Sequence, residues 1–312
     1  MTTGARPDSS APSLVRARIE LIAAAVLWSL SSIFIRLLSE PTPLGLHEPK
    51  LDPLQIAFYR SLFAGMAMIV LLKRADVRVR PIMLAMVVCF ATMSGLYLSA
   101  LSLGPAANAI LLQNTAPVWI CLFAWAFLGE RTDRKTWLSI GIAMIGGTII
   151  VVGNRPSEGA QQSIMLMAAG SGVAYAGVIL FLRFLRGESA AWLTMWNLVG
   201  SALCLAAWVG LRDGGSSLLT WLTAPTASQL AFLAAFGLLQ MALPYCLFAR
   251  GLRTVGPQEA GIITLLEPLL NPLWAFLIAP DRDTPTVWTA LGGIVLLAAI
   301  AMRYWPHRTR TN

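Results

Sequence analysis

The stretch Gly256–Asp281, GPQEAGIITLLEPLLNPLWAFLIAPD, determines how the rest of the chain is interpreted. Its 23 residues from Pro257 to Ala279 are long and apolar enough for a helix that crosses a bilayer, which needs about 20 residues. Glu267 is the one charge near the middle of this span, and Pro268 follows it directly. An ionisable side chain at this depth costs roughly 2.5–3.5 kcal/mol on insertion scales, so Glu267 indicates a functional site.

The composition of the whole chain is typical of a membrane protein. Of 312 residues, 57% are apolar and 12% are charged, and the mean hydropathy is +0.69. Soluble domains have about 25% charged residues. All four cysteines lie inside apolar segments, so we expect no disulfide framework. We predict an all-α polytopic membrane protein with ten transmembrane helices, at about residues 20–38, 54–72, 81–101, 105–128, 136–153, 164–182, 190–211, 228–249, 257–279 and 285–303.

The distribution of basic residues predicts the orientation. If the N-terminus is cytoplasmic, seventeen of the 23 Lys and Arg residues fall in cytoplasmic segments and four in segments on the other side. Such a bias favours both termini inside. Residues 1–19 and 304–312 are then cytoplasmic tails, and the short connections leave no room for a soluble domain. The net charge of +8 is therefore a topology signal, and we expect no nucleic-acid partner.

Two independent anchors indicate that the chain repeats itself. In the first, an offset of 151 residues lays Ala116-Pro117 over Glu267-Pro268. In the second, Arg36 matches Arg183 at an offset of 147. We therefore predict two five-helix halves, 20–153 and 164–303. Because five is odd, the second half is inverted, and inverted repeats are typical of alternating-access carriers that bind substrate near the midplane.

The block Leu96–Gly153 resembles the EamA repeat of the drug/metabolite transporter superfamily. The family's recurring features appear here as Pro117, Leu128-Gly129-Glu130, Trp137 and Gly141. The second half carries the family's Leu-Glu-Pro at 266–268, but Ala279-Pro280-Asp281 stands where a second Leu-Gly-Glu belongs. At that point we expect the ninth helix to be shorter or capped differently. The resemblance implies an exporter or carrier of small metabolites in a bacterial cytoplasmic (inner) membrane.

Prolines predict where backbone carbonyls become available near Glu267. Pro268 cannot donate a backbone hydrogen bond, so the carbonyl of Thr264 is left free, and Pro117 does the same for Gln113. Free carbonyls at membrane depth are tolerated where they face a cavity or other protein. We interpret Glu267 as a contact for a substrate ammonium group or as a proton-coupling carboxylate. The alternative is a structural carboxyl that is neutral or hydrogen-bonded to a neighbouring helix.

Other polar and aromatic residues complete the predicted site. Aromatic faces suit cationic or planar substrates, although most membrane aromatics serve packing. The predicted substrate-binding set is Glu267, Gln113, Asn114, Trp28, Tyr175, Gln240, Tyr245 and Asn271. Arg60, inside the second predicted helix, is interpreted as a gating or structural ion pair with Glu267, the alternatives being an anionic substrate or the headgroups. Arg36, nearer a helix end, is expected to reach the headgroups.

Two patterns of small residues predict close helix packing rather than a site. They are Ser61-x-x-x-Gly65 and Ala143-x-x-x-Gly147. Small residues at this spacing let helix backbones approach one another in a membrane.

Three classes of membrane protein have this kind of composition: transporters, membrane-embedded enzymes and channels. A transferase acting on lipid-linked substrates needs a metal or acid/base cluster, but His47 and His307 both lie outside the predicted spans. A channel places charge rings or filter loops between subunits, and no such pattern is visible. We predict a secondary transporter, an exporter of amino acids, amines or related polar solutes, rather than an enzyme. We expect no cofactor or metal. The expected partners are a small-molecule substrate and the lipid bilayer, with a proton as a candidate coupling ion. The oligomeric state, monomer or homodimer, is left open.

Overall fold

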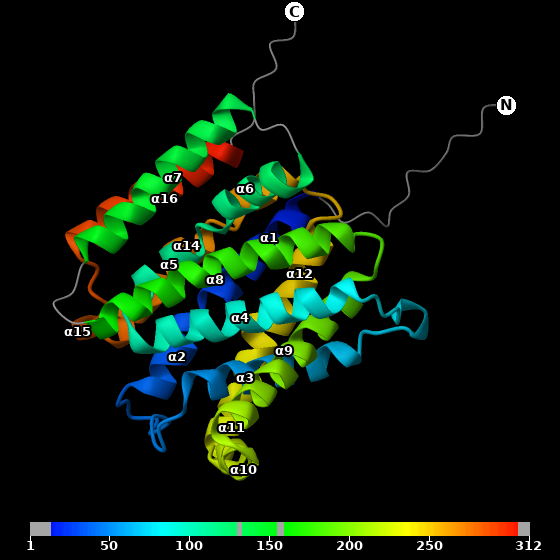
Figure 1. The fold of residues 1–312 in the computed structure, drawn as a ribbon, viewed down its shortest axis with the longest axis vertical. Coiled ribbons are helices and arrows are strands. Elements are labelled where there is room, and N and C mark those ends of the chain that lie inside the picture. Colours follow the sequence, from blue (N-terminus) through cyan, green and yellow to red (C-terminus); the bar gives the residue numbers. More distant parts are fainter. Residues whose placement is uncertain (1–13, 130–132, 155–158, 305–312) are drawn as a thin grey trace, which may run out of the picture.

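The computed structural model describes residues 14–129, 133–154 and 159–304. Within these ranges every regular element is a helix (Figure 1). Eight helical stretches are long and apolar enough to cross a membrane, and Val287–Met302 is a shorter apolar helix. The prediction of an all-α polytopic membrane protein is confirmed at this level, while ten membrane crossings and an inverted repeat stay predictions.

The helices occupy the apolar windows of the sequence, and several of them are broken. The eight candidate spans are α1 (Leu14–Ser29) with α2 (Ser31–Ser39), α4 (Ile82–Leu103), α5 (Ala106–Gln113) with α6 (Ala116–Leu128), α7 (Arg134–Gly153), α8 (Gly159–Phe184), α9 (Ala190–Asp213), α11 (Ala227–Gly237) with the π-helical η2 (Leu238–Ala242) and α12 (Leu243–Gly251), and α13 (Pro257–Ile263) with α14 (Leu266–Ile278). The two remaining windows hold α3 (Pro53–Ile69) and α16 (Val287–Tyr304).

Three short helices lie between these elements. They are η1 (Arg74–Asp76), α10 (Gly215–Thr223) and α15 (Pro280–Asp283). The departure from the family's Leu-Gly-Glu therefore takes the form of a separate helical turn, α15, directly after α14. Its Asp283 is 1% exposed.

The bundle has two ends, which we name by one acidic residue each. At the Asp283 end, α2 and α4 terminate and α5 begins, and Arg36 bonds both Asp283 and Gly104. At the Glu259 end, α1 and α13 begin, and Arg18 pairs with Glu259 at 2.5 Å. A separate cluster of buried side chains packs near each end, one containing Phe34 and Leu101 and the other containing Met83 and Leu185.

Helix pairs from distant parts of the sequence form the bundle. α4 packs along α8 and α9, α3 along α9, and α1 along α12 and α14. α7 and α16 pack along each other and lie to one side of the other helices (Figure 1). Small residues lie on the surfaces between these pairs.

Glycines set the closest approaches between helices. A methyl group on Gly65 would come within 2.6 Å of the Val199 side chain on α9. This agrees with the close helix packing predicted at Gly65. The contact expected at Gly147 falls one residue earlier. A methyl on Gly146 would lie 2.7 Å from the carbonyl oxygen of Gly292 in α16, whereas one on Gly147 would make an ordinary 3.7 Å contact.

Candidate functional site

Two candidate spans are interrupted at corresponding places, beside their prolines. α5 ends at Gln113 and α6 begins at Ala116, while α13 ends at Ile263 and α14 begins at Leu266. α6 and α14 share an offset of 150 residues at both ends, one less than the offset that aligns their prolines. Helix ends are uncertain by this much. The observed helix boundaries thus agree with irregular backbone near Gln113 and Glu267. The Thr264 carbonyl is nevertheless not free as predicted, because the Glu267 N–H donates to it at 3.1 Å.

A third irregularity precedes Pro244. The turn Leu238–Ala242 is π-helical, and α12 begins directly after it. Single π-helical turns often occur at functional sites. Gln240 lies inside this turn and is 5% exposed, and its Nε2 donates to the carbonyl of Trp28 at 3.2 Å. The turn thus joins the eighth predicted helix to the first.

Glu267 is the second residue of α14, at the helix break, and is partly exposed. Among the described residues, its carboxylate has no hydrogen-bond or ion-pair partner. The carboxylate therefore remains available to a ligand. A carboxyl hydrogen-bonded to a neighbouring helix is not observed among the described residues in this conformation, and the neutral structural carboxyl stays the alternative.

Arg60 is 2% exposed in α3 and is held by neutral groups. Its guanidinium donates to Gln240 Oε1 at 3.2 Å and to Ser94 Oγ at 2.9 Å, and it lies 5.3 Å from the centre of the Phe236 ring. Its Nε is buried without a hydrogen-bond partner in the described part of the chain. The expected ion pair with Glu267 is not formed within 4.0 Å in this conformation, so a gating role for the two charges stays a prediction.

Aromatic rings gather at α1 and α12. The Trp28 ring lies 5.4 Å from the Tyr245 ring and 5.1 Å from the Phe248 ring, centre to centre. All three side chains are partly exposed. The structure thus brings together Trp28, Tyr245 and Gln240 from the predicted set. Since α1 also packs on α14, these residues and Glu267 lie on adjacent helices.

Asn271 is engaged by the protein itself. It is fully buried in α14, and its Oδ1 accepts from the backbone N–H of Ser32 at 3.1 Å. Its Nδ2 donates to Ser31 Oγ at 2.8 Å and to the Tyr97 hydroxyl at 3.4 Å, while Ser32 Oγ donates to the Asn271 carbonyl at 2.6 Å. The predicted substrate contact is therefore occupied here by a bond network that ties α14 to α2 and α4.

We expect Asn271→Ala to lower the free energy of unfolding by about 2–3 kcal/mol, since a buried polar group left without its partner costs about 1–3 kcal/mol. Denaturant unfolding of the purified protein in detergent measures the change. The matched control is Asn114→Ala, because Asn114 is partly exposed and its Nδ2 bonds only the Ile110 carbonyl of its own helix in the described contacts. Equal unfolding midpoints for the two variants would show that the Asn271 network does not hold α14.

The remaining predicted residues lie along α5, α6 and α8. Gln113 and Asn114 are partly exposed at the α5–α6 break, and Tyr175 is 38% exposed on α8, which packs on α6. Gly172 of α8 brings its backbone against this break, since a methyl group there would lie 3.0 Å from the Gln113 carbonyl oxygen. These residues flank the break of the first half rather than joining the contacts made by Arg60.

The expectation for Arg36 was wrong. Its side chain does not reach a surface but is 0% exposed, with Nε 2.5 Å from Asp283 Oδ2 and Nη2 2.7 Å from Asp283 Oδ1. The sequence could not show this pairing, because the partners are 247 residues apart and Asp283 lies outside the predicted spans. Ser94 and Phe236 were missed for a similar reason, since neither is charged and each lies within an apolar window.

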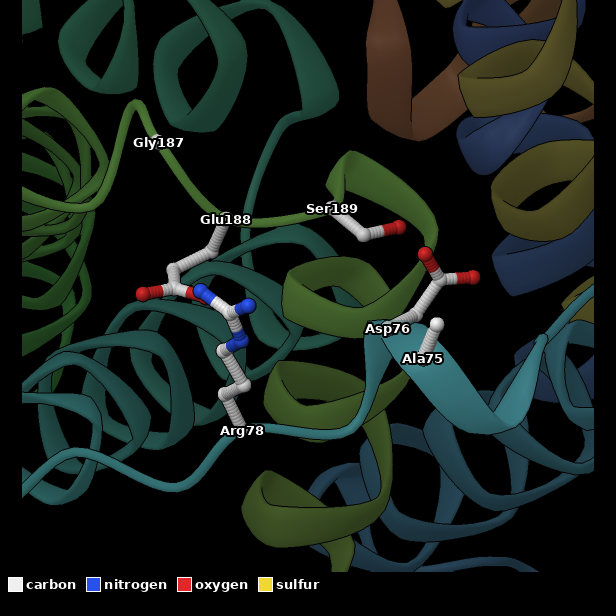
Figure 2. Close-up of a pocket in the computed structure, with 6 residues that line it drawn as sticks. All are labelled: Ala75, Asp76, Arg78, Gly187, Glu188 and Ser189. Carbon is white, nitrogen blue, oxygen red and sulfur yellow. The ribbon is translucent and has the colours of Figure 1, made fainter.

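The pocket of about 310 Å³ at the Glu259 end is separate from these residues. Figure 2 shows it between two loops, with the Arg78 and Glu188 side chains near each other and Asp76 and Ser189 on its other side. Arg80 lies 3.5 Å from Glu188 and so joins the same two loops. None of the residues lining it belongs to the predicted site.

The candidate spans indicate a polytopic membrane protein, and the comparisons with known proteins make it a transporter. The sequence profile of the EamA-like transporter family matches residues 17–152 and again 162–305. The chain therefore belongs to the EamA-like transporter family.

Relatives of this chain are also transporters by name. An uncharacterized transporter of Archaeoglobus fulgidus is 27% identical over 287 residues, which is 91% of this chain and 94% of the relative. The pseudopaline exporter of Pseudomonas aeruginosa strain PAO1 is 22% identical over 250 residues, 78% of this chain and 84% of the relative. A solved structure matches with a TM-score of 0.60 at 17% identity, covering 93% of this chain and 97% of that one, and so supports the fold alone.

Proposed function

We propose that this protein is a secondary transporter that moves small polar metabolites carrying an amino group, such as amino acids and amines, by alternating access. The observation that carries the proposal is the Glu267 carboxylate, which has no counter-ion among the described residues and lies at a break in a candidate span. A charge in this setting is retained for ligands or ions. Family membership favours a transporter over a membrane-embedded transferase.

The ten-helix inverted repeat is supported by how the helices pack. In the predicted repeat, α1 of the first half corresponds to α8 of the second, and α4 of the first half corresponds to α12 of the second. The α1–α12 contact is therefore equivalent to the α8–α4 contact, and both pairs pack together. The α5–α6 span packs on α8 as the α13–α14 span packs on α1 and α2. The predicted second helices, α3 and α9, pack on each other, as do the fifth, α7 and α16. Such a relation suits a carrier with a two-fold related midplane site.

The packing also supports one particular conformation. Near the Asp283 end, α5 packs on α14. Toward the Glu259 end the continuations diverge, because α6 packs mainly on α8 and α7, and α13 on α16 and α1. We interpret this as a state closed at the Asp283 end and open toward the Glu259 end. With the basic residues placed inside, the Glu259 end faces the cytoplasm and both termini are cytoplasmic.

The charges support the proposed substrate class. A substrate ammonium group would pair with Glu267, beside the Trp28 and Tyr245 rings, which also attract cations. Arg60 supplies a buried positive charge paired only with neutral groups, which suits a substrate carboxylate. Export from the cytoplasm of a bacterial cell agrees with the function of the Pseudomonas relative.

Counterflow in proteoliposomes tests the function. We expect radiolabelled amino acids to accumulate most when the same substrate is trapped inside, simple amines less, and carboxylic acids without an amine not at all. A transmembrane pH gradient applied in a separate experiment shows whether a proton is coupled. If no member of an amine-containing panel supports counterflow while an amine-free solute does, the assignment of Glu267 to an ammonium group is wrong.

A further inference from the structure

The Asp283 end holds a group of contacts that the proposed binding site does not explain. Here two short elements, α2 and α15, contact the junction between α4 and α5, residues 101–106. We propose that these contacts, which we call the Asp283 clamp, form the gate that closes this end, and that the clamp must release the junction once in every transport cycle. The inference rests on the proposed alternating access.

The clamp is built on a buried bidentate ion pair. Arg36 and Asp283 are 0% and 1% exposed, and two N–H···O bonds of 2.5 and 2.7 Å join them. Paired bonds of this kind fix the geometry of both groups. Arg36 and Asp283 also form hydrogen bonds outside the pair, and both form them with the junction between α4 and α5.

The junction between α4 and α5 presents complementary helix ends. The last carbonyls of a helix lack partners within it and carry partial negative charge, and the first N–H groups of the next helix carry the opposite charge. Arg36 donates to the carbonyls of Leu101 and Gly104 at 3.0 and 2.8 Å, while the Ala106 N–H donates to Asp283 Oδ1 at 2.8 Å. The positively charged Arg36 thus contacts the C-terminal end of α4, and the negatively charged Asp283 contacts the N-terminal end of α5.

Further bonds cross the same boundary. Arg282 Nη2 donates to the Ser102 carbonyl at 2.5 Å, and Arg282 also pairs with Glu40. The hydroxyls of Ser39 and Ser102 are 3.3 Å apart. These bonds lie beside the buried Arg36–Asp283 pair, at the end of the bundle where α5 packs on α14.

The grouping of the helices indicates which bonds break. Three of the Asn271 bonds, at 2.6–3.1 Å, join α14 to α2, and the fourth, at 3.4 Å, reaches Tyr97 of α4. Because α15 also packs on α14, α2, α14 and α15 form one group. α4 and α5 both pack on α8 and form the other. The Arg36–Asp283 pair lies within the first group, so it stays intact while its bonds to residues 101–106 break. Keeping the pair avoids the cost of leaving a buried charge alone.

At the Glu259 end, the ion pairs are more exposed. Arg18 and Glu259 are 47% and 41% exposed in their side chains, and Arg80 is 53% exposed although its partner Glu188 is only 10% exposed. Exposed pairs contribute little to holding two elements together. This contrast supports a structure that is closed by the clamp and open at the other end.

A reversible cross-link tests whether the clamp must open. In a background without the four native cysteines, Ser39→Cys and Ser102→Cys place two thiols where hydroxyls now lie 3.3 Å apart, one on each group. We expect oxidation to lower counterflow at least tenfold and reductant to restore it, with Ser39→Cys alone insensitive to oxidant. Full counterflow by a protein shown to be cross-linked would overturn the proposal. No counterflow before oxidation, with any substrate, would instead count against the proposed function.

A second measurement needs no transport. Ala109→Cys places a reporter on α5, where the native side chain is 1% exposed. We expect Asp283→Asn to raise its labelling by an impermeant maleimide about tenfold, from one face of the membrane only, in oriented vesicles. The control is Asp213→Asn, because Asp213 pairs only with the neighbouring, exposed Arg212 in the described contacts and lies outside the clamp. Unchanged labelling in folded Asp283→Asn protein would contradict the clamp; if that variant does not fold, the cross-link decides.

Discussion

Glu267→Gln is expected to lower counterflow of amine-containing substrates roughly 30-fold or more while leaving the folded yield unchanged. Removing one partner of a desolvated charge pair at a binding site costs about 2–5 kcal/mol, and each 1.4 kcal/mol is a factor of about ten. In the free protein the carboxylate has no ion-pair partner among the described residues, so its neutralisation leaves no basic side chain without a counter-ion. Gln also preserves the size of the side chain, so the loss is confined to binding.

Two controls separate this effect from a general loss of charge. Glu259→Gln removes another carboxylate of the same span, but its partner Arg18 is 47% exposed, so we expect counterflow within twofold of the unmodified protein. Counterflow and gradient-driven transport are measured on the same vesicles. If Glu267 binds the substrate, both fall together; if it carries only a proton, counterflow survives and the pH-gradient response is lost. A Glu267→Gln protein normal in both assays would rule out either role.

The positions of the helices could be predicted because apolar length and proline act locally. The α13–α14 break beside Pro268 and the irregular turn before Pro244 both follow from a missing backbone donor. The isolated charge of Glu267 was visible for the same reason, since its depth depends only on the span around it. These features need no knowledge of which helices are neighbours.

Side-chain partners could not be predicted, because they depend on which helices come together. Arg60 was expected to pair with the single deep carboxylate, yet the fold places it between Ser94 and Gln240. Arg36 was expected at a surface, yet α15 carries Asp283 to it across 247 residues. In both cases the charge could have been satisfied in more than one way, and the tertiary packing decides between them.

Gly292→Ala is expected to disrupt the α7–α16 pair and to lower the free energy of unfolding by about 2 kcal/mol relative to a Gly→Ala change elsewhere in the same helix pair. The added methyl would lie 2.6 Å from the Gly146 carbonyl oxygen and 3.1 Å from the Ile150 backbone nitrogen. Both are backbone atoms of α7, which cannot rotate away as a side chain can, so the helices must separate. Overpacking typically costs about 1–3 kcal/mol, and in a membrane close contact between small residues is a main source of helix association.

The control for this prediction is Gly141→Ala in α7. A methyl group on Gly141 would meet nothing within 4 Å, so its only effect is the better helix propensity of Ala, about 1 kcal/mol in favour of folding. The same gain applies to Gly292→Ala, so the difference between the two variants isolates the cost of the close approach. Denaturant unfolding in detergent, with size-exclusion profiles, measures both. The reciprocal contact adds an internal check: Gly146→Ala should behave like Gly292→Ala, and Gly147→Ala, one residue further along α7, like the control. Equal midpoints for all four would show that α7 and α16 do not approach this closely.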